Sequence, residues 1–196
     1  MLIVFEGIDG CGKGTQIELL KKELGGTLEI FKYPTNKTPE LNEFLEKKKE
    51  FDQREVFHLF LKDIMNEQDE VREKLKAGIV VLDRYVLSTA AYEKDGISSS
   101  EAKKIISGMG FLKPDLVILM DMDPKVSQER KRKQKSLDRY EADVKYLENV
   151  RKNFLELAKE RFLTPNWHII DASQSVSVVH QKIMDVVKSE LSRFRC

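Results

Sequence analysis

The sequence has little cysteine, with only Cys11 and Cys196 among its 196 residues. One stands near the start of the chain and the other at its end, so a disulfide framework is not expected and a reducing compartment fits. Histidine is also scarce, and His58, His168 and His180 have no metal-ligand spacing with one another or with the cysteines. The composition therefore predicts no metal centre built on histidine and cysteine.

Long hydrophobic runs are missing as well. No stretch approaches the roughly 18 apolar residues that suggest a membrane-spanning helix, and the chain opens on an apolar run without a basic leader. Neither sign of charge is in excess, since 34 lysines and arginines face 33 aspartates and glutamates, for a formal net charge of +1. We therefore expect a cytoplasmic protein with no membrane partner and no nucleic-acid partner.

What the chain does contain is typical of one soluble globular domain. It is 41% hydrophobic and 34% charged, and its length suits one well-buried core better than two. We find no internal repeat and no low-complexity linker, so we expect a single domain over residues 1–196. The local charge is uneven, because residues 130–135 place five cations in six positions.

Short apolar runs alternate with longer helical patterns along the chain. The expected strands are Leu2–Phe5, Leu28–Phe31, Ile79–Leu82, Leu116–Met120 and Trp167–Ile170. The expected helices are Lys13–Leu24, Arg54–Lys76, Ser100–Met109, Pro124–Arg132, Asp143–Arg161 and Ser175–Arg193. Short apolar strands separated by helices are buried on both faces of a parallel sheet. The pattern therefore predicts an α/β fold, a three-layer α/β/α sandwich on a five-stranded parallel sheet.

A phosphate-binding loop follows the first expected strand. The segment reads Gly7-Ile8-Asp9-Gly10-Cys11-Gly12-Lys13-Gly14-Thr15 and leads into a helix, which is the layout of a P-loop. Its glycines permit tight turns, its N–H groups and the helix dipole attract phosphate, and Lys13 adds a positive charge. We therefore predict a protein that binds nucleoside triphosphates. The competing interpretation is a glycine-rich turn with an exposed lysine.

Two further features concern magnesium and phosphate. Gly14 stands where the motif has serine or threonine, so the hydroxyl near Mg²⁺ must come from Thr15 or be replaced by water. The third expected strand runs into Asp83-Arg84-Tyr85. A strand-ending carboxylate beside a P-loop is expected to organise Mg²⁺, and Arg84 can hold a phosphate in a bidentate fork. Alternatively, Asp83 caps a helix and Arg84 is a surface cation.

Five segments together resemble the thymidylate kinases, over residues 2 to about 180. In chain order they are Phe5–Gln16, Tyr33-Pro34, Asp83-Arg84-Tyr85 with Ser88, Lys113-Pro114-Asp115 and Asp138-Arg139-Tyr140-Glu141. The resemblance implies a fold of the P-loop kinase type and transfer of the γ-phosphate of ATP to dTMP, with Mg²⁺ and in a homodimer.

The resemblance also implies roles for single residues. Lys13 would hold the donor phosphates, and Arg84 would bind the acceptor phosphate. Asp9 and Asp83 would organise Mg²⁺, its waters and the acceptor sugar. The acceptor pocket would comprise Tyr33, Pro34, Phe60, Ser88, Thr89, Tyr92 and Tyr140, with Phe60 stacked on thymine and Tyr140 beside the deoxyribose. The segment 171–175, with Ser173, would receive adenine largely through its backbone.

Two of these assignments have plain structural alternatives. Phe60 belongs to an apolar helical stripe with Val56, Leu59 and Ile64, which on its own indicates core. The segment 171–175 also reads as an ordinary strand-to-helix turn.

The basic run stands where these kinases carry a lid over the phosphates, and we place the lid around residues 130–140. Gly10 occupies a loop position where some members of the family have an arginine, so the lid must supply that cation. Arg130, Arg132 and Arg139 are the candidates, with Arg132 as the first choice. For Lys131, Lys133 and Lys135 taken singly, a solvated surface position is the better interpretation.

Two departures from the family bear on the acceptor. Ile64 stands where the family has an arginine that hydrogen-bonds thymine, and Thr35-Asn36-Lys37 replaces a segment with an arginine near the acceptor phosphate. Lys37 offers only a point charge there. The alternatives to a thymidylate kinase are therefore a kinase for dUMP, UMP or CMP and, from another class, a nucleotide-dependent switch or binding module.

Overall fold

The computed structural model describes residues 1–25, 28–93, 96–132 and 143–194. Its strands are β1 (Leu2–Glu6), β2 (Leu28–Lys32), β3 (Ile79–Asp83), β4 (Leu116–Asp121) and β5 (Trp167–Asp171). Its helices are α1 (Lys13–Leu24), α2 (Pro39–Leu45), α3 (Gln53–Met65), α4 (Gln68–Ala77), α5 (Val86–Ala91), α6 (Ser99–Gly108), α7 (Pro124–Arg132), α8 (Val144–Lys159) and α9 (Val176–Phe194).

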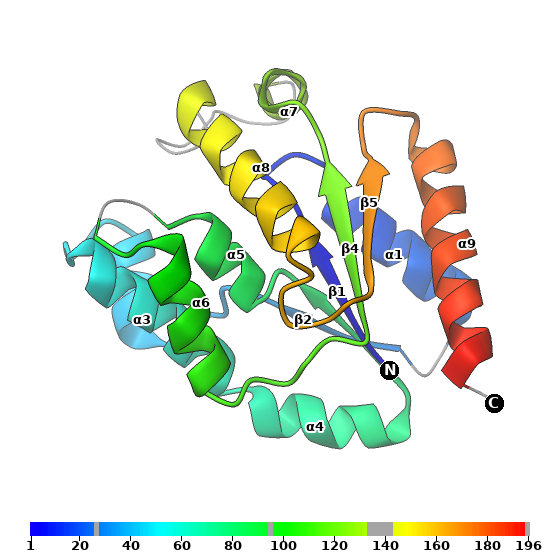
Figure 1. Cartoon of the computed structure of the whole chain (residues 1–196), viewed down its shortest axis with the longest axis horizontal. Coiled ribbons are helices and arrows are strands. Elements are labelled where there is room, and N and C mark those ends of the chain that lie inside the picture. The colour runs from blue at the N-terminus through cyan, green and yellow to red at the C-terminus, as the bar shows by residue number, and fades with distance from the viewer. Residues whose placement is uncertain (26–27, 94–95, 133–142, 195–196) are drawn as a thin grey trace.

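The five strands form one parallel sheet in the order β2-β3-β1-β4-β5. Helices α1 and α9 lie side by side on one face, and α5 and α8 cover the other, with α3 and α6 packed against α5 (Figure 1). The prediction of a three-layer α/β/α sandwich with a five-stranded parallel sheet is confirmed.

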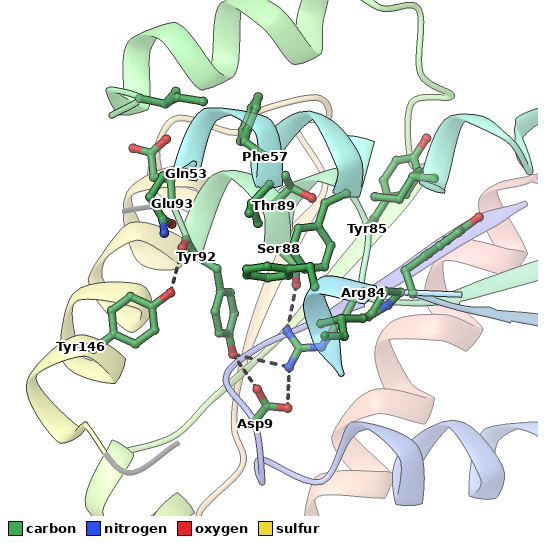
Figure 2. Close-up of a pocket in the computed structure, with 18 of the residues that line it drawn as sticks. Asp9, Gln53, Phe57, Arg84, Tyr85, Ser88, Thr89, Tyr92, Glu93 and Tyr146 are labelled. Atoms are coloured by element: carbon green, nitrogen blue, oxygen red, sulfur yellow. Dashed lines mark hydrogen bonds and ion pairs between the residues drawn. The ribbon is translucent and has the colours of Figure 1, made fainter. Parts of the chain in front are cut away.

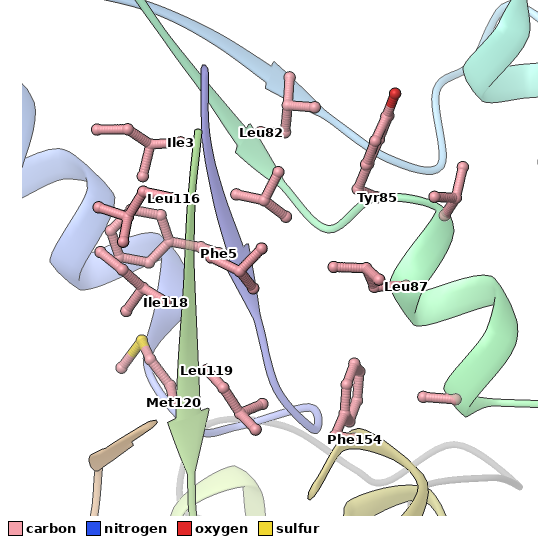
Figure 3. Close-up of a cluster of buried hydrophobic side chains, with 14 of the residues drawn as sticks. Ile3, Phe5, Leu82, Tyr85, Leu87, Leu116, Ile118, Leu119, Met120 and Phe154 are labelled. Atoms are coloured by element: carbon pink, nitrogen blue, oxygen red, sulfur yellow. The ribbon is translucent and has the colours of Figure 1, made fainter. Parts of the chain in front are cut away.

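The core lies on both faces of the central strands (Figure 3). Every residue of β1 is buried, and so are the large side chains of Phe5, Tyr85 and Phe154. Fully burying such side chains contributes about 1.5–3 kcal/mol each to the hydrophobic free energy of folding. The buried sheet therefore holds the loops at its carboxyl edge in fixed positions.

The predicted strands are confirmed, and each continues one residue beyond its apolar run. Those added residues are all polar: Glu6, Lys32, Asp83, Asp121 and Asp171. Backbone pairing persists past the last apolar residue, as in the pairing of Phe5 with Asp83. The carboxyl edge of the sheet is therefore lined with ionisable side chains.

The prediction of one helix over Arg54–Lys76 is wrong, because α3 ends at Met65 and a separate helix, α4, begins at Gln68. Glu67 is buried and forms an ion pair of 2.7 Å with Lys37. The Gln68 side chain accepts hydrogen bonds from the Tyr85 hydroxyl and from the backbone N–H of Leu112. These tertiary contacts bend the chain at a point where the apolar period continues without interruption.

Helices α2 and α5 are absent from the sequence-based prediction. Helix α5 has six residues, all buried, and that length is too short to display a helical period. Helix α2 begins at Pro39, where the missing N–H does no harm. Among the residues described, no helix is long and apolar enough to cross a membrane.

Candidate functional site

The P-loop connects the end of β1 with the start of α1 at the carboxyl edge of the sheet. Gly7, Gly10 and Gly12 have φ angles of 140°, 80° and 95°, which L side chains rarely adopt. A Cβ atom on Gly7 would also lie 2.6 Å from the carbonyl oxygen of Met120. The glycines are therefore required by the turn and by its close approach to β4.

Lys13 is buried inside this loop. Its Nζ atom donates hydrogen bonds to the carbonyl oxygens of Gly7 at 2.8 Å and Ile8 at 3.2 Å, and to the Cys11 sulfur at 3.7 Å. The exposed-lysine alternative is thus wrong. The ammonium group lies within the curve of the loop, where a phosphate would meet it.

A charged cluster joins the P-loop to the end of β3 (Figure 2). Arg84 Nη2 donates to Asp9 Oδ1 at 2.7 Å, and the Tyr92 hydroxyl donates to Asp9 Oδ2 at 3.2 Å. Burial opposes the charge on Asp9, but Arg84, Lys13 and Lys131 hold the pKa of its carboxyl well below the ordinary range. Asp9 is therefore an anion that orients the Arg84 guanidinium.

The backbone of Arg84 has a positive φ of 71°, which is uncommon for a residue with a side chain. Its N–H donates to the carbonyl oxygen of Phe5, and its Nη1 donates to the Ser88 hydroxyl at 3.1 Å. The side chain is only 15% exposed, so the surface-cation alternative is wrong. Arg84 is therefore fixed both at its backbone and at its guanidinium group.

Glu6, at the end of β1, bonds the residues that follow Arg84. Its carboxyl group is fully buried and accepts hydrogen bonds from the backbone N–H groups of Tyr85 and Ser88 and from the Ser88 hydroxyl. Burial raises the pKa of Glu6 to about 7, against the opposing effects of Ser88, Arg84 and Lys13. Glu6 thus fixes the start of α5, which carries the next pocket residues.

A cavity of about 340 Å³ opens beside Arg84. It is lined by Asp9, Tyr33, Pro34, Phe44, Leu45, Gln53, Val56, Phe57, Phe60, Ile64, Arg84, Tyr85, Ser88, Thr89, Tyr92, Glu93, Ile97, Tyr146 and Leu147. All the described residues that we expected in the acceptor pocket line this one cavity. Tyr140, the remaining member, lies outside the described residues. Lining a cavity does not test binding, so the substrate roles stay predictions.

Several lining residues were not expected in the acceptor pocket, among them Gln53, Phe57, Glu93 and Tyr146. Tyr146 of α8 donates a hydrogen bond to the carbonyl oxygen of Tyr92, and the two rings lie 6.3 Å apart. No local pattern points to Tyr146, because it enters the cavity through tertiary packing. Glu93 follows the end of α5 at Ala91, so no helical spacing points to it either.

The polar groups are unevenly distributed around the cavity. Asp9, Arg84 and Tyr92 bond to one another at one end, whereas Gln53 and Glu93 lie at the opposite end in Figure 2. Ile64, at the position where an arginine was expected, is buried and apolar. The cavity is therefore a largely apolar pocket with one strongly polar, cationic end.

The carboxylate of Asp83 lies at the end of β3. Its Oδ2 atom is 4.0 Å from Lys32 Nζ, and its buried Oδ1 atom has no hydrogen-bond partner in the part of the chain that the structure describes. The helix-cap alternative is not supported, because Tyr85 precedes α5 without a side-chain cap. Thr15 is exposed in the first turn of α1.

Helix α7 packs directly on the P-loop. The Ser127 hydroxyl donates to the carbonyl oxygen of Asp9, and Lys131 Nζ lies 3.8 Å from Asp9 Oδ1. Lys131 is only 12% exposed, so its expected surface position is wrong. Arg132, our first choice for the lid cation, is exposed at the end of α7.

Arg130 lies on the donor side of the same helix. It donates two hydrogen bonds of 2.9 Å, to the carbonyl oxygens of Ala172 and Ser173 in the loop after β5. The segment expected to receive adenine is thus tied to α7. Most of the expected lid, including Arg139, lies outside the described residues.

Comparisons with known sequences identify one family. Residues 5–183 match the family model for thymidylate kinase. The chain is 35% identical to the probable thymidylate kinase of Archaeoglobus fulgidus over 202 aligned positions, which cover 98% of this chain and 97% of the relative. It is 32% identical to the thymidylate kinase of Homo sapiens, over 93% of this chain and 87% of the human protein.

Comparison with solved structures gives the same fold. The thymidylate kinase of Candida albicans superposes with a TM-score of 0.78 at 24% identity, over 96% of this chain and 91% of that one. The enzyme of Ehrlichia chaffeensis gives a TM-score of 0.75 at 24% identity, over 96% and 98% of the two chains.

Proposed function

Because the chain belongs to the thymidylate kinase family, we propose that it transfers the γ-phosphate of ATP to dTMP, which gives dTDP and ADP. It is an ATP-dependent nucleoside monophosphate kinase. One observation supports this function above all: Asp9 belongs to the P-loop and also lines the cavity that contains Arg84. A donor phosphate in the loop and an acceptor phosphate at Arg84 would therefore be neighbours.

In the donor half of the site, the P-loop N–H groups and Lys13 hold the phosphates of ATP. The ammonium group of Lys13 is already inside the loop, so its hydrogen bonds pass from the carbonyl oxygens of Gly7 and Ile8 to phosphate oxygens. The loop residues 7–15 contribute backbone donors. Ser173 and its neighbours, which Arg130 ties to α7, receive the adenine.

In the acceptor half, the guanidinium of Arg84 holds the phosphate of dTMP. Its hydrogen bonds to Asp9 and Ser88 fix its orientation before the substrate arrives, so little side-chain entropy is lost on binding. Phe60, Tyr33 and Pro34 enclose the thymine, with Thr89 at its edge. Tyr92 lines the base pocket with Ser88 and Thr89, and the family resemblance implies Tyr140 beside the deoxyribose.

The chemistry then rests on alignment and charge. The acceptor phosphate oxygen attacks the γ-phosphorus of ATP in line, the bond to the β-γ bridging oxygen breaks, and ADP leaves, with no covalent enzyme intermediate. Lys13 and Arg84 neutralise the charge that spreads over the transferred group, and Arg132 supplies a third cation when the lid closes. Arg130 is held by the carbonyl oxygens of Ala172 and Ser173, which favours Arg132 over Arg130 for that role.

The residues present fit a magnesium ion. The buried Oδ1 atom of Asp83 has no partner among the described residues, and a hydrated Mg²⁺ would provide one. Thr15 would contribute its hydroxyl, directly or through water. The described residues contain no cluster of three or more histidine, cysteine or carboxylate side chains, so phosphate oxygens and waters would complete the shell. When bound, Mg²⁺ would neutralise charge on the ATP phosphates.

The proposal also includes the oligomeric state of the protein and its location in the cell. The family resemblance supports a homodimer, and the composition supports a cytoplasmic location. Gel filtration with light scattering tests the first of these directly.

A coupled assay of ADP release tests the function. With ATP and Mg²⁺ we expect dTMP to be the best acceptor among dTMP, dUMP, UMP, CMP and AMP. Lys13→Ala should reduce kcat by orders of magnitude, because it removes a transition-state cation that the fold does not need. Near-normal turnover in a folded Lys13→Ala variant would contradict the proposed donor site.

A further inference from the structure

The base end of the cavity contains a carboxyl group that the proposed function does not use. Glu93 follows α5 and lines the cavity, and its Oε2 atom is buried without a hydrogen-bond partner among the described residues. A buried polar atom left unpaired costs about 1–3 kcal/mol. Such an atom in an otherwise apolar pocket is expected to meet a polar group of the ligand.

The position of Glu93 excludes the phosphate as that group. Figure 2 places Glu93 and Gln53 at the end of the pocket away from Asp9 and Arg84. Thr89, which we place at the edge of the thymine, lines the same cavity. With the phosphate at Arg84, the group of dTMP that reaches this end is the pyrimidine base.

At this end of the pocket, Glu93 is the one carboxyl side chain among the described lining residues that could hydrogen-bond the pyrimidine edge. Ile64 offers no hydrogen bond where the family has an arginine, and it is buried. Thymine presents an acceptor at O4 beside a donor at N3–H. A neutral carboxyl group has one donor and one acceptor, but a carboxylate only accepts.

Resting on the proposed dTMP kinase activity, we propose that Glu93 is a substrate-binding residue that reads the O4 and N3–H edge of the thymine base. In its neutral form the carboxyl group donates to O4 and accepts from N3–H. In its ionised form it keeps only the hydrogen bond from N3–H and repels O4, so the binding of dTMP weakens.

The surroundings of Glu93 place the ionisation of its carboxyl group in an accessible pH range. Burial raises the pKa of Glu93 to about 7, while Lys103 lowers it and Glu101 raises it. Both neighbours are on α6, and Glu101 also pairs with Arg54 of α3. From α8, Tyr146 directs its hydroxyl to the carbonyl oxygen of Tyr92.

The test compares the wild type with Glu93→Gln from about pH 6 to pH 8.5, because an amide always carries one donor and one acceptor. We expect the wild-type kcat/KM for dTMP, divided by that of Glu93→Gln, to fall roughly tenfold or more across this range, because the neutral fraction of a group with a pKa near 7 falls about tenfold for each pH unit above it. This ratio cancels the ionisation of the substrate phosphate, which is the same for both proteins.

A second variant and a control isolate Glu93. Glu93→Leu should lower the kcat/KM for dTMP at pH 6, because the base then loses both of its hydrogen bonds to Glu93. Glu101→Gln should keep the pH dependence, with its midpoint moved to lower pH.

The outcomes separate this inference from the proposed function. A ratio of wild type to Glu93→Gln that does not change with pH would overturn the role of Glu93 while dTMP is still phosphorylated. A wild-type protein that phosphorylates dTMP at no pH would overturn the proposed function itself.

Discussion

Glu6 and Asp9 stand three residues apart and have opposite electrostatic surroundings. Glu6 is fully buried, and its pKa is raised to about 7, whereas the cations around Asp9 lower the pKa of that carboxyl. Both groups act on Arg84 and its neighbour Ser88. At the scale of residues, the acceptor end is thus built from one buried acid that fixes Ser88 and one partly buried anion that fixes the Arg84 guanidinium.

The buried acid gives a prediction about stability. The pKa of Glu6 is about 7 in the folded protein and about 4.5 ordinarily, so between these values the unfolded chain releases a proton that the folded chain retains. This group therefore lowers the free energy of unfolding as pH rises through that window, by up to about 3 kcal/mol. Glu6→Gln should remove this loss, as measured by urea unfolding at pH 5 and pH 8. An equal loss in both proteins would mean that other groups cause it.

Sequence reasoning identifies residues whose role depends on local order. Asp9, Lys13 and Arg84 stand in fixed positions relative to a strand end, and a strand end in a parallel sheet points to the ligand edge. Tyr146 and Glu93 reach the cavity through the packing of α8 and the end of α5, which no local spacing encodes. The orientation of Lys13 toward its own loop could not be predicted either, because it depends on backbone carbonyl positions.

At the scale of elements, α7 and the P-loop depend on each other. Gly10 has a φ of 80°, and a Cβ atom there would lie 2.8 Å from the Ser127 hydroxyl oxygen and 3.0 Å from the Ser127 carbonyl oxygen. No longer side chain fits at this position while α7 keeps its place. The P-loop therefore has no room for a cationic side chain at residue 10, and α7 instead brings Lys131 to within 3.8 Å of Asp9.

Gly10→Ala should consequently disturb catalysis. The added methyl group must displace the backbone of α7 and occupy a strained φ, at a cost of about 1–3 kcal/mol. We expect kcat to fall about tenfold or more and the KM for ATP to rise, in the coupled assay. Gly14→Ala is the matched control, because a Cβ atom there meets nothing within 4 Å. It should be neutral or stabilising by up to about 1 kcal/mol. Equal effects of the two changes would contradict the packing argument.

Elements differ in how well their sequences predict them. The strands were found to within one residue because each is a buried apolar run. The break between α3 and α4 was missed, since it arises from the contacts of Glu67 and Gln68 with distant residues. Helix α5 was missed because all six of its residues are buried, which leaves no polar face to define a period.

At the scale of the whole molecule, the acceptor cavity joins parts of the chain that are far apart in sequence. Asp9 comes from the P-loop, Pro34 follows β2, Phe60 lies on α3, and Tyr146 lies on α8. The sheet places the loops at one edge, so their meeting follows from topology. The closure of α8 over that edge does not, because it depends on side-chain packing such as that of Tyr92 on Phe154.

A ligand that contacts all these parts should stabilise the whole molecule. At a dTMP concentration of about 100 times its Kd, mass action adds about 2.7 kcal/mol to the free energy of unfolding. For a chain of this size the corresponding rise in Tm is about 5 to 10 °C, measurable by calorimetry without ATP. Lys13→Ala should retain the rise, because Lys13 contacts the P-loop carbonyls and does not line the cavity. Arg84→Ala should lose most of it at the same dTMP concentration, since the phosphate loses its bidentate partner. If Lys13→Ala abolishes the rise and Arg84→Ala does not, dTMP binds at the P-loop, and the assignment of donor and acceptor halves must be reversed.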